Sequence, residues 1–189
     1  TVNAQNSEMA KLEQKAKAGD AEAQAKLADK LYNQERYDEA FQWYKKAADN
    51  GNARGMSNLS TCYCNGRGVA RDYATAIVYA TKAAEMGYPH AQYHLATHYE
   101  SGNGVDKDSL KAYEWYKKAA DNEEPRAQYA LGQFYFYGEG VEKNMDEAMK
   151  WTKLSAEQGN SDAQYFIGLI YHENKDYTEA MKWLDTAIA

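Results

Sequence analysis

The sequence predicts an all-α protein made of stacked helix hairpins, and three observations lead to this prediction. Helix-forming residues dominate the 189 positions, and only two are proline. A Gly-x-Gly-Val turn recurs at Gly66, Gly102 and Gly138, each 36 residues after the last. Apolar columns keep the same step on both sides of the turn. One hairpin cannot bury its apolar face alone, so we expect the hairpins to stack into a solenoid.

The columns define about five helix-turn-helix units. The 36-residue step links Leu59, Leu95, Leu131 and Ile167 upstream of the turn, and Ala40, Ala76, Ala112 and Ala148 downstream of it. The first and last units are four residues shorter, because the Gly-x-Gly-Val segment is absent from them. In these units the second helix follows directly, with Arg36 before Tyr37 and Asp176 before Tyr177. The predicted repeat domain covers 20–189, with units at about 20–51, 52–87, 88–123, 124–159 and 160–189.

The first helix of a unit is predicted from a buried stripe. Ala127, Leu131 and Tyr135 recur at i, i+4 and i+8. Gly132 gives a neighbouring helix close approach, at a helix-propensity cost of about 1 kcal/mol. Gly138 ends the helix, because Gly readily adopts the positive φ of a C-cap.

Capping residues predict where the other helices begin. Asp72, Asp108 and Asn144 stand where the second helices start, and all three are good N-cap residues. Pro89 and Pro125 stand where first helices start, a position that tolerates the missing N–H. These residues predict where several of the first and second helices begin.

The N-terminal segment 1–19 is predicted to be a capping helix. Met9, Leu12 and Ala16 form an apolar stripe between Ser7 and a closing Gly19. This pattern is that of the second helix of a preceding, degenerate unit. The C-terminus stops within or just after a final helix, which suggests a truncated array.

The unit pattern resembles the Sel1-like repeat, the 36-residue relative of the tetratricopeptide repeat. The matching pattern is A-x-x-x-L-G-x-x-Y-x-x-G-x-G-V, then D-x-x-x-A-x-x-W, then A-x-x-G, and it covers about 20–189. Asn144 stands where the family has Asp, and Glu123 stands where it has Gly. The resemblance implies a right-handed α-α superhelix whose first helices line the concave side. It also implies an adaptor that assembles protein complexes, as in signalling, stress responses and bacterial–host contact.

By analogy with tetratricopeptide repeats, certain first-helix positions face the groove. The candidate partner-binding residues, called the groove residues below, are Tyr32, Arg54, His90, Tyr93, Arg126, Tyr129, Phe136, Tyr137, Tyr165 and His172.

Aromatic residues make up the strongest part of this set. Tyr93, Tyr129 and Tyr165 form one column, which is either a ligand-facing ladder or packing between repeats. Phe136 and Tyr137 lie outside the core columns of the repeat and are the favoured anchors, since Tyr brings contact area and a hydrogen bond at low entropic cost. Arg54 and Arg126 either grip a peptide carboxylate or are solvated charges.

No catalytic, metal or cofactor site is predicted. His90, His94 and His98 have a spacing that places neighbouring pairs on one helix face, but no further ligand motif accompanies them. The Gly-x-Gly turns follow helices rather than strands, so they are not phosphate loops. Cys62 and Cys64 point to different sides of a helix and have no sequence-placed base.

Charge and hydropathy restrict the class of partner. The net charge of −6 carries no basic stripe and argues against nucleic acid. No apolar run approaches the ~18–20 residues that span a bilayer, so membrane insertion is not expected. Two free thiols favour a cytoplasmic location over a periplasmic or secreted one.

The leading hypothesis is therefore a non-catalytic scaffold that binds a peptide or a partner protein in its concave groove. We expect a monomer, or weak self-association through the end faces. One alternative is a β-lactam-binding or hydrolysing enzyme, as suggested for cysteine-rich relatives, although this chain lacks their Cys pair in each unit. The other alternative is a structural stacking unit of a longer array.

Overall fold

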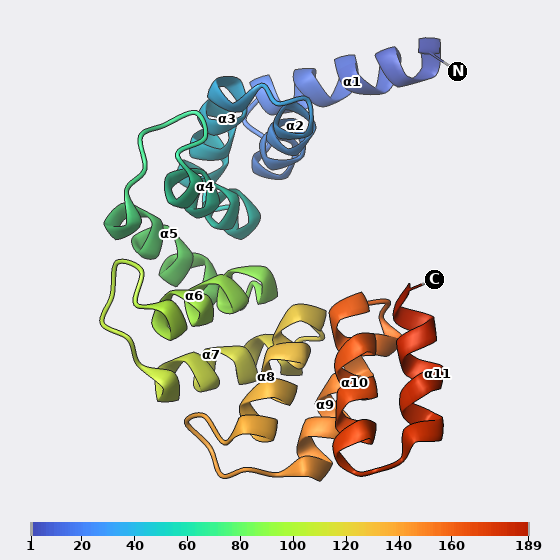
Figure 1. The fold of residues 1–189 in the computed structure, drawn as a ribbon. Helices are drawn as coiled ribbons and strands as arrows, with labels where there is room; N and C mark the ends of the chain where they lie inside the picture. Colours follow the sequence, from blue (N-terminus) through green and yellow to red (C-terminus); the bar gives the residue numbers. More distant parts are fainter. Residues whose placement is uncertain (1, 189) are drawn as a thin grey trace. The chain divides into compact units, whose positions relative to one another are not determined.

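The computed structural model describes residues 2–188, and the predicted domain ends at Thr1 and Ala189 lie outside the described residues. Eleven helices and no strand occupy this part of the chain, which confirms the predicted all-α class (Figure 1). The helices are α1 (Val2–Lys17), α2 (Ala21–Asn33), α3 (Tyr37–Asp49), α4 (Ala53–Asn65), α5 (Tyr73–Glu85), α6 (Pro89–Ser101), α7 (Ser109–Asp121), α8 (Pro125–Tyr137), α9 (Met145–Glu157), α10 (Ser161–Glu173) and α11 (Tyr177–Ile188).

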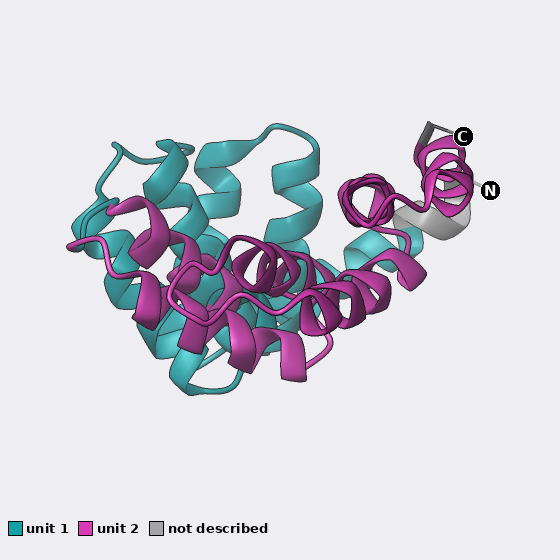
Figure 2. Ribbon diagram, turned by 60° about the horizontal axis from the view of Figure 1, so that its bottom comes forward, with its two compact units in different colours: residues 1–91, 103–105 teal, residues 92–102, 106–189 magenta. Residues whose placement is uncertain are grey.

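The chain divides into two compact units (Figure 2). Unit 1 runs as far as Ala91 and also contains the turn residues 103–105, whereas unit 2 comprises 92–102 and the chain from Asp106 onward. Within unit 1, α1 packs on α2, α2 on α3, α3 on α4 and α4 on α5. Within unit 2, the same sequential packing joins α7, α8, α9, α10 and α11. Each unit is therefore a short stack of helix hairpins.

The predicted capping residues perform their expected roles. The side chain of Asp72 accepts a hydrogen bond from the Thr75 amide at 3.1 Å, and Asp108 caps α7 in the same way. Asn144 caps α9 by accepting from two backbone amides at 3.1 Å. Gly138 ends α8 in the left-handed region, with φ of 76°. Both ends of these helices thus follow from local chemistry.

The second Gly of each turn has a separate role, which the sequence pattern did not reveal. A Cβ added at Gly68 would overlap the carbonyl oxygen of Tyr37, the first residue of α3. A Cβ at Gly140 would lie 3.0 Å from the carbonyl oxygen of Ser109, the first residue of α7. Each turn therefore packs against the start of the preceding second helix, and only Gly permits this close approach.

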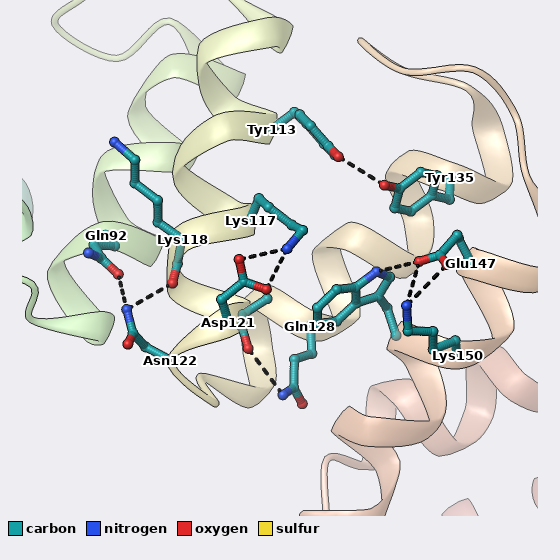
Figure 3. A network of polar contacts seen from close by, with 12 residues as sticks. Gln92, Tyr113, Lys117, Lys118, Asp121, Asn122, Gln128, Tyr135, Glu147 and Lys150 are labelled. Atoms are coloured by element: carbon teal, nitrogen blue, oxygen red, sulfur yellow. Dashed lines mark hydrogen bonds and ion pairs between the residues drawn. The ribbon is translucent and has the colours of Figure 1, made fainter.

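A buried glutamine links successive hairpins within each unit. Gln128 is 4% exposed, and its Nε2 donates to the Ala120 carbonyl at 3.4 Å (Figure 3). Its Oε1 accepts from Gln158 at 2.8 Å. Gln24 makes the equivalent bond to the Ala16 carbonyl at 3.0 Å. These bonds satisfy side chains that would be costly to bury unpaired.

Helix α1 begins at Val2, earlier than the Ser7 start that its apolar stripe indicated. Ala16 is 1% exposed, and Met9 and Leu12 pack against the same core cluster. The bond from Gln24 to the Ala16 carbonyl attaches α1 to α2. The contacts agree with a second-helix register for α1, and its role as a cap stays a prediction.

Candidate functional site

All the groove residues lie on first helices of hairpins. They fall into two groups: unit 1 holds Tyr32 (α2), Arg54 (α4) and His90 (α6), and unit 2 holds Tyr93 (α6), Arg126, Tyr129, Phe136 and Tyr137 (α8), and Tyr165 and His172 (α10).

In unit 1, one pocket of about 290 Å³ brings Tyr32, Arg54 and His90 together. Its remaining lining is mostly polar and comprises Asp29, Asn33, Tyr44, Asn58 and Thr61. The first-helix register therefore gathers these three groove residues at a single hollow of the surface.

Arg54 is held by carboxylates of its own chain. Its guanidinium forms an ion pair with Asp29, and Nη1 lies 3.8 Å from a carboxylate oxygen of Glu22. Asp29 also accepts hydrogen bonds from Tyr44 at 2.7 Å and from Asn58 at 2.8 Å. Burial, and then the bond to Asp29, raises the pKa of the Tyr44 phenol, so the phenol stays protonated and donating. This network positions the guanidinium and leaves part of its five-donor fork for a ligand.

The other two residues of this pocket are also positioned by neighbours. Arg67, in the Gly-x-Gly turn, donates to the Tyr32 hydroxyl and lies with its guanidinium carbon 5.3 Å from the Tyr32 ring centroid. The Tyr37 ring meets Tyr32 edge-on at 5.1 Å. His90 Nδ1 lies 3.2 Å from the Ser57 hydroxyl. Tyr32 and His90 thus each contact neighbouring side chains of the same unit.

In unit 2, Arg126 stacks on Tyr93. Its guanidinium carbon lies 4.4 Å from the Tyr93 ring centroid, and its Nε donates to Glu124 at 2.8 Å. Burial raises the pKa of the Tyr93 phenol. Arg126 resembles Arg54 in being held by a carboxylate of the chain, so neither is a freely solvated charge.

An aromatic cluster joins α8 to α10 in the same unit. Phe136 packs edge-on against Phe166 at 5.2 Å and against Tyr137 at 4.9 Å. Tyr137 is 60% exposed. Beside this pair lies a pocket of about 300 Å³, lined by Phe136, Tyr137, Lys143, Met145 and Glu173.

The tyrosine column splits in the structure. Tyr93 is half-buried beneath Arg126, and Tyr129 is half-buried against Phe166 at 5.7 Å between ring centroids. Tyr165 is 52% exposed. Packing between repeats accounts for the first two, whereas Tyr165 lies on α10, the first helix of the last hairpin described. His172 is exposed and stacks edge-on with Tyr177 at 5.3 Å.

Phe166 is the residue of this cluster that the sequence pattern missed. It immediately precedes Ile167, at a position where other units carry Asn58, His94 and Ala130. An aromatic residue in an otherwise variable column was the available signal. Its ring is 3% exposed and contacts Tyr129, Phe136 and Tyr137.

The histidine and cysteine residues offer little reactive chemistry. His98 is 6% exposed and belongs to a helix interior, and residues 2–188 contain no group of three or more His, Cys, Asp or Glu side chains placed to hold a metal. Burial raises the pKa of the Cys62 thiol to about 12 and also raises that of Cys64. Both thiols are therefore protonated at neutral pH and are weak nucleophiles.

These stacked hairpins, with Gly-x-Gly turns between their helices, define an α-helical repeat protein of the tetratricopeptide type. The Sel1 repeat pattern matches at 21–52, 53–88, 89–123 and 125–160, and a tetratricopeptide repeat matches at 152–189. The chain belongs to the Sel1 repeat family, whose members commonly serve as protein-interaction scaffolds.

Solved structures agree with this assignment. The chain is 31% identical to a protective antigen of uropathogenic Escherichia coli with an SLR fold, over 95% of this chain and 41% of that one, with a TM-score of 0.84. It is 30% identical to a Sel1 repeat protein from Oxalobacter formigenes, over 90% and 73% of the two chains, with a TM-score of 0.82. For Helicobacter pylori cysteine rich protein B, the identity is 28%, over 66% and 89%, with a TM-score of 0.54.

The chain thus spans less than half the length of the E. coli antigen. No curated protein matches the chain. Within residues 2–188, no helix combines the length and apolar character needed to cross a membrane.

Proposed function

We propose that this chain is a non-catalytic scaffold that binds a peptide, or an extended segment of a partner protein, along its first helices. The observation that carries the proposal is the pocket beside Phe136 and Tyr137 in unit 2, where Tyr137 is 60% exposed. A large aromatic side chain left in water at the edge of a pocket gains from burial under a ligand.

Phe136 and Tyr137 would have different roles in binding. Phe136 is half-buried and wedged against Phe166 at 5.2 Å, so it forms a rigid floor. Tyr137 is the reachable anchor, with Lys143 and Glu173 beside it. An apolar ligand side chain would enter the pocket, and the two opposite charges at its edge would select flanking polar groups.

An arginine of the same unit would contribute orientation. Arg126 is already held by the Glu124 carboxylate, so its remaining N–H donors are presented in fixed directions. Pre-positioned donors lower the entropic cost of binding a peptide carbonyl or carboxylate. Arg126 shares helix α8 with the aromatic anchors.

The test is selection of linear peptides from a phage-displayed library on the wild-type protein, followed by fluorescence anisotropy with synthetic peptides. Tyr137→Ala should weaken the selected peptides at least about tenfold, the loss of one buried aromatic anchor. Leu110→Ala is the matched control, since Leu110 is 56% exposed on α7 of the same unit and does not line the pocket. Enriched peptides that bind Tyr137→Ala as tightly as the wild type would refute the placement.

Phe136 is a poor probe because its substitution would also loosen the packing of α8 on α10. The contact with Phe166 belongs to a buried cluster with Ile170 and Ala148. A loss of binding in Phe136→Ala would therefore mix recognition with stability. Tyr137, mostly in solvent, separates the two.

An enzymatic role has less support. The buried thiol of Cys62 has a pKa of about 12 because it is desolvated, and a β-lactam hydrolase using it would need an activating base. The stacking-unit alternative rests on Tyr177 and Met181 of α11, which are 56% and 59% exposed. Light scattering across a concentration series addresses that alternative.

A further inference from the structure

A second pocket of unit 1 lies between α1 and α3, and residues of α2 form its base. Its volume is about 300 Å³. Leu27 and Leu31 form an apolar floor at 2% and 3% exposure, and the half-buried Trp43 forms one wall. Its edge carries four charged residues, Glu13, Lys17, Arg36 and Glu39. We call this the α1–α3 pocket.

The next repeat of the same unit fills the equivalent space with its own side chain. Tyr63 of α4 lies with its ring 5.5 Å from Phe41 of α3, edge-on, and 6.1 Å from Tyr79 of α5, stacked at an interplanar angle of 5°. The ring is thus held between two successive second helices. Similarly, in unit 2 the Tyr135 hydroxyl of α8 lies 2.9 Å from the Tyr113 hydroxyl of α7.

The first repeat lacks this aromatic ring. Leu31 occupies the position that Tyr63 has in the next repeat, and Met9 occupies the position of Phe41. Trp43 occupies the position of Tyr79. Leu31 is shorter than Tyr and offers no ring to stack on Trp43. The Lys46 ammonium lies 4.2 Å from the Trp43 ring centroid. The equivalent Lys82 lies 5.7 Å from the Tyr79 centroid in the next repeat, so this contact coexists there with the stacked Tyr63 ring.

The shortened turn removes a second filling group. In the next repeat, Val69 of the Gly-x-Gly-Val turn packs against the unit 1 core. The first repeat lacks those four residues, and Arg36 precedes α3 without a side-chain capping bond. The first repeat therefore lacks both the Tyr ring and the Val side chain that the next repeat contributes to the core.

We infer that the α1–α3 pocket binds a tyrosine-like aromatic side chain presented by a loop of a partner protein. In the next repeat the equivalent space holds the Tyr63 ring, stacked on Tyr79 at the position that Trp43 occupies in the first repeat. The charged residues at the edge form two ion pairs. Arg36 Nη2 lies 2.7 Å from Glu39 Oε2, and Lys17 Nζ lies 3.9 Å from Glu13 Oε2. They offer donors and acceptors to a phenol hydroxyl and to the flanking backbone. The volume stands at the lower limit for ligand sites, which suits one side chain rather than a larger molecule.

This inference is independent of the proposed function, because the two pockets lie in different units and use different residues. The variant that tests it is Leu31→Tyr, which places the missing ring on the chain itself. If the pocket takes an aromatic side chain, the internal ring occupies it first. Tyr137→Ala is the matched control, since it leaves the α1–α3 pocket unchanged.

The first experiment is selection of disulfide-constrained loops from a phage-displayed library on the wild-type protein. The enriched loops should share an aromatic residue, bind Leu31→Tyr at least tenfold more weakly, and bind Tyr137→Ala unchanged. Loops without a shared aromatic residue, equal affinity for Leu31→Tyr, or no enrichment would each overturn the inference. Circular dichroism and the thermal midpoint establish that Leu31→Tyr is folded.

The second experiment uses the smallest probe and does not depend on that variant. N-acetyl-L-tyrosine amide is titrated into the ¹⁵N-labelled protein, with N-acetyl-L-leucine amide as the comparison. The tyrosine derivative should shift the Trp43 indole resonance more than those of the other tryptophans, and the leucine derivative should shift it less. A Trp43 resonance that responds equally to both, or to neither, argues against an aromatic site. Trp43→Ala, which removes the stacking wall, should weaken the selected loops as well.

Discussion

The substitution Gly132→Ala tests the packing of α8 on α9, because it adds a single methyl group at the contact between the two helices. A Cβ added there would overlap the Thr152 hydroxyl and lie 3.4 Å from Thr152 Cβ and 3.3 Å from the Ala148 carbonyl oxygen. Thr152 is fully buried, and its hydroxyl donates to that carbonyl at 2.6 Å. The threonine therefore has little freedom to move away.

Two opposing effects set the magnitude of Gly132→Ala. Overpacking a buried site costs about 1–3 kcal/mol. Replacing Gly by Ala within a helix contributes about 1 kcal/mol in the stabilising direction. We expect a net loss of about 0–2 kcal/mol in the free energy of unfolding. In a Thr152→Ala background, the overlapping hydroxyl is gone, so the same substitution should stabilise by up to about 1 kcal/mol. The coupling between the two positions should then be about 1–3 kcal/mol.

The assay is urea denaturation followed by circular dichroism for the four proteins of the double-mutant cycle. Equal m-values across the cycle are required, since a repeat protein can lose cooperativity. Ala96→Gly, at the Gly132 position of the preceding repeat, should destabilise the protein, because it lowers helix propensity and also removes a buried methyl group. If Gly132→Ala has the same effect with and without Thr152, the two side chains are not in conflict and the reasoning fails.

Three further predictions concern local chemistry. Glu123 has φ of 62°, so Glu123→Gly should stabilise the protein by about 0.5–1 kcal/mol in urea melts, whereas the control Glu139→Gly, outside the positive-φ region, should not. Arg36 precedes α3 without a capping bond; Arg36→Asn should raise the thermal midpoint by about 2–4 °C, and Arg36→Ala should not. Burial raises the pKa of Cys62 to about 12, so the unfolded thiol ionises first as pH rises past its ordinary value of ~8.5. The contribution of Cys62 to the free energy of unfolding is therefore complete below that pH and falls above it by up to about 1.4 kcal/mol per pH unit. Denaturant unfolding of Cys62→Ala at the same pH values should not show this decrease. Identical slopes for the two proteins would contradict the desolvated thiol.

Local signals in the sequence were enough to predict the hairpins. Asp72 and Asn144 cap helices through bonds within three residues, and Gly138 ends a helix through its own φ. Such interactions need no distant partner, so a pattern read along the chain can locate them. The close approach at Gly132 was also predictable, although the identity of its neighbour, Thr152, was not.

The candidate sites were predictable only in part. Tyr32, Arg54 and His90, which the register predicted to face the groove, line one pocket of unit 1, because a helical register fixes which residues share a face. It did not foresee that Arg54 pairs with Asp29. The α1–α3 pocket was not predicted at all, since it arises from an absent ring beside Leu31.

The sequence by itself determined the repeat, its helices and their capping, because these depend on spacing and on backbone preferences of single residues. The tertiary structure alone decided what each repeated side chain contacts. Tyr93 and Tyr129 hold the same place in their repeats, yet the first lies under the Arg126 guanidinium and the second packs on the Phe166 ring. The difference comes from the side chains that the following hairpin brings against each helix, and those are set by stacking rather than by the repeat's own pattern.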